Sequence, residues 1–255
     1  MILTESDYYS QESNRDFMSV SQFKDFMKCP AMAMAKLCGE YEPEHGRALL
    51  LGSYVDEMLT GTKESQDKFI QDNRAELCKK NGELYADVAQ AVETIQRVRE
   101  QPVMMKYLNG EHQRIMTGEI EGVPFKIKMD SYKHGEFIAD LKYMASLRSP
   151  NLFQPMIRYW GYDIQAACYQ EIVRQNIGEK LPTYLACITK QAPPDLAVVE
   201  IPQEQLDAEM AVLRQKLPLF EAMRLGVIEA PRCNHCAYCR QSRTITRPLS
   251  ITEFN

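Results

Sequence analysis

The segment from residue 113 to 142 most constrains the fold of this chain, because it predicts three short consecutive strands that carry two aspartates. The residues RIMTGEI and EGVPFKIKMD form a strand, a turn at EG and a second strand that ends at Asp130. A further turn at HG leads into EFIADLK over residues 136–142, a third strand that carries Asp140 near its end. If the second and third strands pair as a hairpin, the two carboxylates meet at one end of a sheet.

Apolar residues recur at helical spacing on both sides of this meander. Ser21 is a candidate N-cap for the first helix, and Pro30 predicts a break inside it. The order is typical of an α/β or α+β fold. The predicted helices cover residues 19–37, 47–59, 86–100, 159–176 and 203–225, and two further strands cover residues 181–190 and 196–201.

The two aspartates and Lys142 form a candidate catalytic group. Mg²⁺ is commonly held by one or two carboxylates together with phosphate and water. Alternation along a strand places Asp140 and Lys142 on the same face of the sheet. A lysine beside a metal-bound carboxylate can orient the attacking water or offset charge on a phosphate. The simpler interpretation is an aspartate and a lysine on the surface of an edge strand.

Other polar residues are candidates for the same site. Gln165 and Tyr169 are four residues apart on a predicted helix and therefore share a face, although a solvent-facing helix would show the same pattern. Upstream, Asp56 or Glu57 can supply a third carboxylate, or they can form an ordinary exposed acidic pair. The residues alone do not choose between the two acids.

A cysteine cluster marks the C-terminal tail. Cys233, Cys236 and Cys239 lie within seven residues of a polar, arginine-rich segment. Thiolates at this spacing suit Zn²⁺ or an iron–sulfur cluster. A fourth ligand is needed, for which Cys29 is the leading candidate and His235 the alternative. The other four cysteines lie in ordinary segments and are predicted to be plain thiols.

Composition limits the functional classes. The chain of 255 residues has a formal net charge of −5, which disfavours a protein that coats nucleic acid by bulk charge. An acidic nuclease that binds metal ions with carboxylates remains compatible with this charge. No apolar run approaches the ~20 residues of a membrane helix. The polar, acidic start is unlike a secretory signal, so we expect a cytoplasmic protein.

The motifs, taken in order, resemble the PD-(D/E)xK nuclease superfamily, and most of all phage and prophage exonucleases of the exodeoxyribonuclease VIII (RecE-like) type. The resemblance rests on Gly52 and Asp56, on GVPFKIKMD and IADLK, and on Gln165 and Tyr169, and it extends from about Ser19 to Cys239. It implies a restriction-endonuclease-like core, a central mixed sheet flanked by helices, over residues 1–230. The cysteine-rich tail, 231–255, would be a metal-binding appendage.

The resemblance also implies roles for single residues. Asp130, Asp140 and the carbonyl of Leu141 would bind Mg²⁺ or Mn²⁺, and Lys142 would be the catalytic lysine. Gln165 and Tyr169 would shape the site and contact DNA. Asp56 stands where RecB-type members usually carry a histidine. In several nucleases of the superfamily one early and three late cysteines hold a [4Fe–4S] cluster, and Cys29 with the three tail cysteines is similar.

The implied activity is 5′-to-3′ degradation of one strand of linear duplex DNA in a bacterial host. The product would pass to a single-strand annealing protein, and a ring-shaped homo-oligomer would give processivity. Two alternatives stay open: a nuclease that trims single-stranded ends, like those of CRISPR adaptation, and a catalytically silent DNA-binding module. A zinc-ribbon interaction protein would leave the acidic residues unexplained.

Basic and aromatic residues predict a DNA path on this acidic chain. Phosphate contacts supply most of the sequence-independent affinity for DNA. Tyr159 and Trp160 can stack on a frayed base or belong to the core. The basic candidates around the meander and the following helix are Lys126, Lys128, Arg148 and Arg158.

Overall fold

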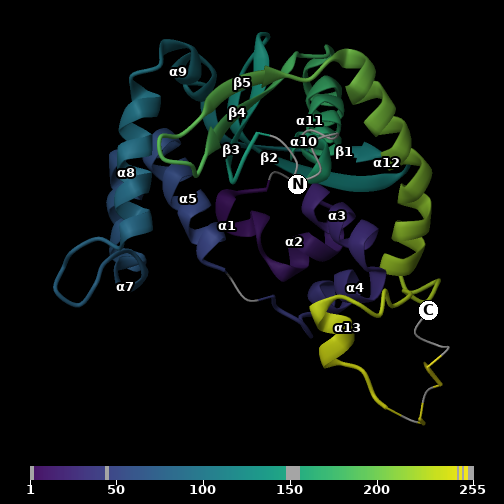
Figure 1. Cartoon of the computed structure of the whole chain (residues 1–255). Helices are drawn as coiled ribbons and strands as arrows, with labels where there is room; N and C mark the ends of the chain where they lie inside the picture. The colour runs from purple at the N-terminus through teal and green to yellow at the C-terminus, as the bar shows by residue number, and fades with distance from the viewer. Residues whose placement is uncertain (1–2, 44–45, 148–155, 246, 249, 252–255) are drawn as a thin grey trace.

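A five-stranded mixed sheet forms the centre of the molecule (Figure 1). The computed structural model describes residues 3–43, 46–147, 156–245, 247–248 and 250–251. The strands lie in chain order, and all neighbours are antiparallel except β3 and β4, which are parallel. They are β1 (Glu111–Ile120), β2 (Val123–Lys133), β3 (Phe137–Met144), β4 (Thr183–Thr189) and β5 (Leu196–Glu200).

Strands β2 and β3 separate part-way along their length. In the described part of the chain they pair over three positions only, from Ser131 opposite Ala139 to Lys133 opposite Phe137. On their other edges β2 pairs with β1 and β3 pairs with β4 along most of their length. The expected hairpin therefore exists, but the two aspartates lie at the fork where its strands diverge, and both strands continue past them.

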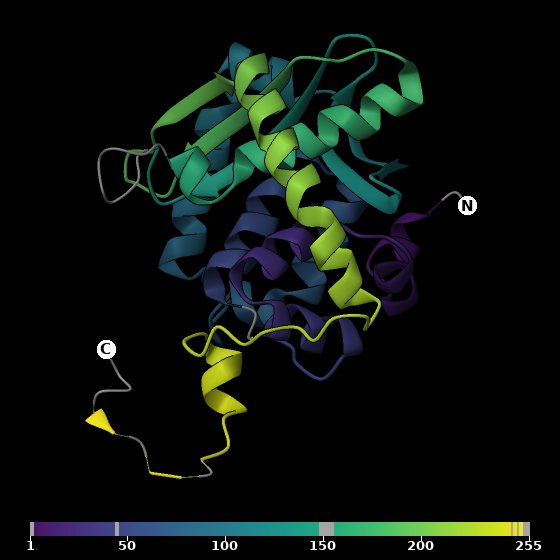
Figure 2. The same ribbon diagram turned by 90° about the vertical axis from the view of Figure 1, so that its right-hand side faces the viewer.

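Two long helices cover one face of the sheet. Helix α11 (Tyr162–Ile177) contacts β1, β2 and β4, and α12 (Gln203–Arg224) packs on α11. Figure 2 shows α12 running diagonally from the sheet toward the C-terminal tail. On α3 (Val20–Lys28), Phe23 meets the Phe220 ring of α12 edge to face at 5.2 Å, and Phe26 stacks on the same ring at 5.5 Å. The apolar side chains of this core pack α3 together with the sheet, α11 and α12.

The opposite face is covered by α5 (Arg47–Thr60), α8 (Ala86–Arg99) and α9 (Pro102–Leu108). Their apolar side chains bury Leu141, Ala186 and Ile188 of the sheet. Since side chains alternate along a strand, Asp140 and Lys142 point toward the α11 face. The remaining helices are α1 (Glu5–Tyr8), α2 (Gln11–Asp16), α4 (Pro30–Cys38), α6 (Lys63–Asp72), α7 (Arg74–Leu77), α10 (Met156–Tyr159) and α13 (Ala237–Gln241).

The predicted central mixed sheet with flanking helices is confirmed, with local differences. The first helix breaks at Pro30 as expected, so that Cys29 ends α3 and begins α4 in an extended conformation. Ser19, and not Ser21, caps α3, because its side chain accepts from the amide of Gln22. The helix expected from residue 159 is divided into α10 and α11 by Gly161, whose φ of 62° is left-handed. None of the helices described here is both long and apolar enough to cross a membrane.

Candidate active site

The fork between β2 and β3 brings the two sequence-predicted aspartates together. Asp130 projects from β2 and Asp140 from β3, each one residue beyond the last pair of the ladder, Ser131 and Ala139. The amide of Leu141 donates a hydrogen bond of 2.9 Å to Oδ2 of Asp130, so that side chain bridges the gap between the strands. Asp140 is buried, at 5% exposed, and Asp130 is half-buried in the wall of the site.

Lys142 lies on the same face as Asp140 and forms an ion pair with its Oδ2. The lysine ammonium also lies 4.8 Å from the centre of the Tyr162 ring. Burial lowers the pKa of Lys142, but the charges of Asp140 and Asp130 raise it, and the net shift is upward. Lys142 is therefore a cation that the acidic group holds in place.

A third carboxylate reaches the fork from α5. Asp56 Oδ2 accepts a hydrogen bond of 3.2 Å from Gln113 on β1, and Oδ1 accepts one of 3.2 Å from Thr60. Its charge acts on that of Asp140. The neighbouring Glu57 instead accepts a hydrogen bond from Ser65 of α6. The fold therefore directs Asp56, rather than Glu57, at the two aspartates.

Helix α11 closes the site with the two predicted polar residues. Gln165 donates hydrogen bonds of 3.0 Å to Asp140 Oδ1 and 3.2 Å to the Tyr169 hydroxyl. Tyr169 in turn donates to the carbonyl of Lys128 at 3.0 Å. Because these contacts tie α11 to both β2 and β3, the helix fixes the width of the fork. The polar face that α11 shows in sequence thus lies against the acidic group.

The electrostatics of this group favour a divalent cation. Burial, and then the charges of Asp140 and Asp56, hold the pKa of Asp130 well above its usual range. Burial also raises the pKa of Asp56, with a further contribution from Asp140. Within the described residues, Oδ2 of Asp140 is buried and has no hydrogen-bond donor besides its ion pair with Lys142. Three close carboxylates fit the hard-oxygen ligand set of Mg²⁺.

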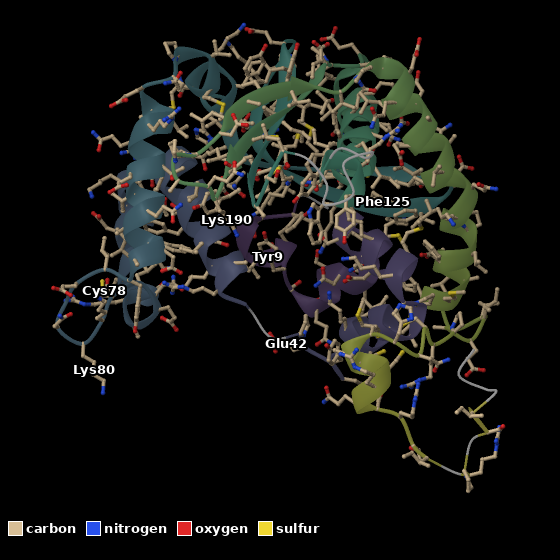
Figure 3. All side chains as sticks on the ribbon, viewed as in Figure 1. Tyr9, Glu42, Cys78, Lys80, Phe125 and Lys190 are labelled. Atoms are coloured by element: carbon tan, nitrogen blue, oxygen red, sulfur yellow. The ribbon has the colours of Figure 1, made fainter. Side chains whose placement is uncertain are left out.

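A cleft of about 810 Å³ opens from the fork toward the N-terminal helices. Its walls include the acidic group together with Tyr8, Tyr9 and Glu42. Tyr9 and Glu42 are labelled in Figure 3. Lys128 lies 4.7 Å from the centre of the Tyr9 ring, so a cation and an exposed aromatic face share the cleft.

The basic residues expected on a DNA path divide into different groups. Lys126 is a correction, because its ammonium is buried and donates to Tyr8 O, Ser13 Oγ and Asn14 Oδ1 at 2.6, 2.9 and 2.8 Å. These contacts use its donors to anchor α1 and α2. Lys128 lines the cleft, whereas Arg158 lies outside it and pairs with Asp163 at 3.8 Å. Arg148 lies outside the described residues.

Sequence reasoning missed Lys24, Gln113 and Tyr162. Lys24 of α3 lies with Nζ 3.4 Å from Oε1 of Gln165 and 5.3 Å from the centre of the Tyr162 ring. Burial, and then the charge of Lys142, lower the pKa of Lys24 to about 8. No local pattern marks these three residues, since each is recruited by packing between distant elements.

The four cysteines form a second polar cluster, where the C-terminal tail with α13 lies beside α4 (Figure 1). The sulfur atoms of Cys29, Cys233, Cys236 and Cys239 all lie within 4.8 Å of one another. Cys29 therefore supplies the fourth thiol, whereas the Nδ1 of His235 faces the carbonyl of Cys233 at 2.8 Å. Of the other cysteines, Cys168 and Cys187 are buried, Cys78 is half-buried and Cys38 is exposed, and all four are free thiols.

The cluster has the geometry and electrostatics of a metal site. Sγ of Cys239 lies 3.6 Å from Cys29 Sγ and 3.9 Å from Cys233 Sγ. Zn–S bonds of about 2.3 Å place tetrahedral sulfurs about 3.8 Å apart, whereas an iron–sulfur cluster needs the sulfurs to move outward. Burial raises the pKa of Cys233, but hydrogen bonds from the backbone amides of His235 and Cys236 outweigh this effect, and the pKa falls to about 6. The pKa values of Cys29 and Cys236 are instead raised, first of all by burial, so the backbone amides favour the thiolate form at Cys233 in particular.

Comparison with known proteins agrees with this architecture. Residues 19–242 match the family model described as a PDDEXK-like domain of unknown function (DUF3799). The chain belongs to this family. The matched residues include the whole acidic group and all four cysteines of the cluster.

Solved structures give a further comparison. A protein from Eubacterium rectale, named a putative exonuclease, has a crystal structure that aligns with 100% of this PDDEXK-like chain and 98% of its own, at 43% identity and a TM-score of 0.94. The structure of SSO0001 covers 89% of this chain and 97% of its own at 14% identity, and its TM-score of 0.33 supports no argument. No curated protein sequence matches this chain.

Proposed function

We propose that this chain is a metal-dependent deoxyribonuclease that hydrolyses DNA from an end. One observation carries the proposal: Asp130, Asp140 and Lys142 converge where β2 and β3 separate. Asp56 completes a set of three carboxylates. The name of the Eubacterium rectale protein, an exonuclease, supports the same activity.

The carboxylates of Asp56, Asp130 and Asp140, with the carbonyl of Leu141, would hold Mg²⁺ or Mn²⁺. When bound, the ion would supply charge stabilisation to the phosphate and activate water for hydrolysis. Lys142 contributes a fixed positive charge beside Asp140, where negative charge develops on the phosphate. Gln165 orients Asp140 through its amide, and Tyr169 orients Gln165.

We infer the direction of cleavage, the substrate and the partners from the resemblance to RecE-like exonucleases. This resemblance implies 5′-to-3′ degradation of linear duplex DNA, a role in phage-type recombination with a single-strand annealing protein, and a homo-oligomer. The cleft beside the acidic group is bounded by α3, α4 and the N-terminal helices, and a separated strand suits such an enclosed path better than an intact duplex. The same cleft is therefore also compatible with the alternative substrate, a single-stranded DNA end.

We propose that the chain is organised as a nuclease core, residues 1–230, and a cysteine-rich tail, residues 231–255. The tail is joined to α4 at Cys29 by the cluster, and the Ala31 amide donates to the Pro231 carbonyl at 3.1 Å. Zn²⁺ or a [4Fe–4S] cluster would hold these parts together.

A nuclease assay tests the proposal. Linear duplex and single-stranded DNA, labelled at either the 5′ or the 3′ end, are incubated with the wild type and with Asp140→Asn, in Mg²⁺ or chelator. We expect Mg²⁺-dependent cleavage that the variant lacks, and the label pattern gives the direction. Binding of DNA without cleavage under all conditions would support the silent DNA-binding module instead.

A further inference from the structure

A second pocket lies behind the catalytic centre, between α3, the α10–α11 connection and α12. Its volume is about 390 Å³. Tyr159 and Trp160 form one wall, and Met27 and Lys28 of α3 form another. The proposed reaction does not use any of these four residues.

The aromatic side chains of this pocket are unusually exposed. Tyr159 and Trp160 have 53% and 49% of their surface exposed, and their rings meet edge to face at 5.1 Å. Met27, on the other side of the pocket, is 45% exposed. Leaving such apolar area in water costs free energy. A ligand with flat apolar faces would remove that area from water.

The charges around the pocket point to an anionic ligand. Lys28 and Arg158 are exposed at its rim, whereas the carboxylate of Asp163 is buried and already accepts from Gln205 at 2.8 Å and pairs with Arg158. Glu209, the other acid of the lining, is half-buried. The cations therefore face solvent and the acids lie deeper. Aromatic faces interleaved with rim cations suit single-stranded nucleic acid, which offers bases to stack and phosphates to pair.

Lys24 connects the pocket with the catalytic centre. Its side chain lines the pocket, and its Nζ lies 3.4 Å from Oε1 of Gln165. Gln165 donates to Asp140, so a single side chain separates the pocket from the acidic group. The pocket and the acidic group therefore lie on either side of the contact between Lys24 and Gln165.

We propose that this pocket is a subsite for single-stranded DNA, in which Trp160 stacks on a base beside the scissile phosphate and Lys28 and Arg158 contact the backbone. The proposal rests on the proposed function, because it assigns the path of that substrate. It makes Trp160 a residue that binds substrate away from the reacting atoms.

Intrinsic fluorescence gives a direct test, because Trp160 is the only tryptophan of the chain. An oligothymidylate of about twelve nucleotides is added to Asp140→Asn protein in Mg²⁺, so that binding is followed without cleavage. We expect saturable quenching, and no quenching by an abasic oligonucleotide of equal length. Unchanged fluorescence while a labelled oligonucleotide binds, or quenching by duplex alone, would overturn the proposal.

Variants give the second test, read from the anisotropy of the labelled oligothymidylate. Trp160→Ala should weaken binding by about 5- to 150-fold, the contribution of one base–aromatic stack. Trp160→Phe should restore binding to within about threefold, since a phenyl ring also stacks. Tyr85→Ala, an exposed aromatic residue in another pocket, is the matched control and should change nothing. Equal binding by Trp160→Ala and wild type would overturn the subsite.

Activity separates failure of the subsite from failure of the nuclease. In an active enzyme, Trp160→Ala should raise KM for single-stranded DNA while kcat changes little. If the wild type cleaves nothing, the proposed function fails, yet quenching and anisotropy still decide whether the pocket binds single strands. If the wild type cleaves and Trp160→Ala has the same KM, only the subsite is refuted.

Discussion

The amide of Leu141 donates a hydrogen bond of 2.9 Å to Oδ2 of Asp130 across the fork between β2 and β3. This contact replaces the strand pairing that ends at Ser131 and Ala139. It holds a half-buried carboxylate at the place where two others converge. The acidic group is therefore built into the sheet, and its like charges oppose folding until a cation is bound.

Asp130→Asn should remove this repulsion without removing the acceptor for Leu141. We expect the variant to be inactive and, in chelator, to unfold at a higher temperature than the wild type. Mg²⁺ should raise the Tm of the wild type and have little effect on the variant. Thermal unfolding with and without Mg²⁺ measures both effects. Glu57→Gln is the control, because Glu57 contacts Ser65, and a similar loss of the Mg²⁺ effect there would contradict the assignment of Asp56 and Asp130.

Lys142→Ala should abolish cleavage and leave DNA binding within a few fold of the wild type. The variant should also be less stable in chelator, by about 3 kcal/mol, because removal of one partner leaves buried carboxylates unpaired. Urea unfolding and a DNA-binding assay measure the two properties on one sample. Parallel loss of binding, in a variant that Mg²⁺ does not restabilise, would make Lys142 structural.

Cys236→Ser should lower the yield of folded protein and remove the bound metal. The reason is that the cluster joins the tail to Cys29, two hundred residues earlier in the chain. Metal analysis by mass spectrometry gives the stoichiometry, and visible absorbance distinguishes an iron–sulfur cluster from colourless Zn²⁺. Cys38→Ser, an exposed cysteine outside the cluster, is the matched control. A well-folded Cys236→Ser protein with unchanged metal would refute the site.

Lys126→Met and Lys128→Ala should separate anchoring from DNA binding. Loss of the Lys126 ammonium leaves the buried acceptors of Tyr8 and Ser13 and the half-buried one of Asn14 without their donor, so we expect a loss of about 2–4 kcal/mol in stability and faster proteolysis of the segment before residue 18. Lys128→Ala should keep the stability of the wild type, weaken DNA binding and reduce its salt dependence. The reverse pattern would return Lys126 to the DNA path.

Glu171 should stabilise the protein in a pH-dependent manner. Hydrogen bonds from Arg174 lower the pKa of Glu171 below 4.5, and burial opposes them. A depressed carboxyl pKa adds stability above the pKa of the unfolded chain, which is lost as the pH falls through the folded pKa. Glu171→Gln should therefore be less stable than the wild type at pH 7, and the difference should disappear once the pH falls below the pKa of Glu171 in the folded protein. Urea unfolding at several pH values checks this, and a constant difference would refute it.

Much of the fold could be predicted because its signals are local. Alternation predicted the three strands of the meander, and helical spacing predicted the helices around it. Pro30 predicted the break that leaves Cys29 between two helices. The helix after residue 159 was predicted as continuous because the left-handed turn at Gly161 depends on one glycine, which leaves no trace in the apolar pattern.

The sequence by itself determined which residue types could bind metal: an aspartate pair with a lysine on rigid strands, and three cysteines in seven residues. These patterns depend only on spacing along the chain, which sets the face of a strand and the reach of a thiolate. The tertiary structure decided which distant side chains join them. Packing of α5 selected Asp56 over Glu57, the tail brought three cysteines to Cys29, and burial turned Lys126 into an anchor. Such choices depend on how sheet and helices meet, and spacing along the chain does not encode that geometry.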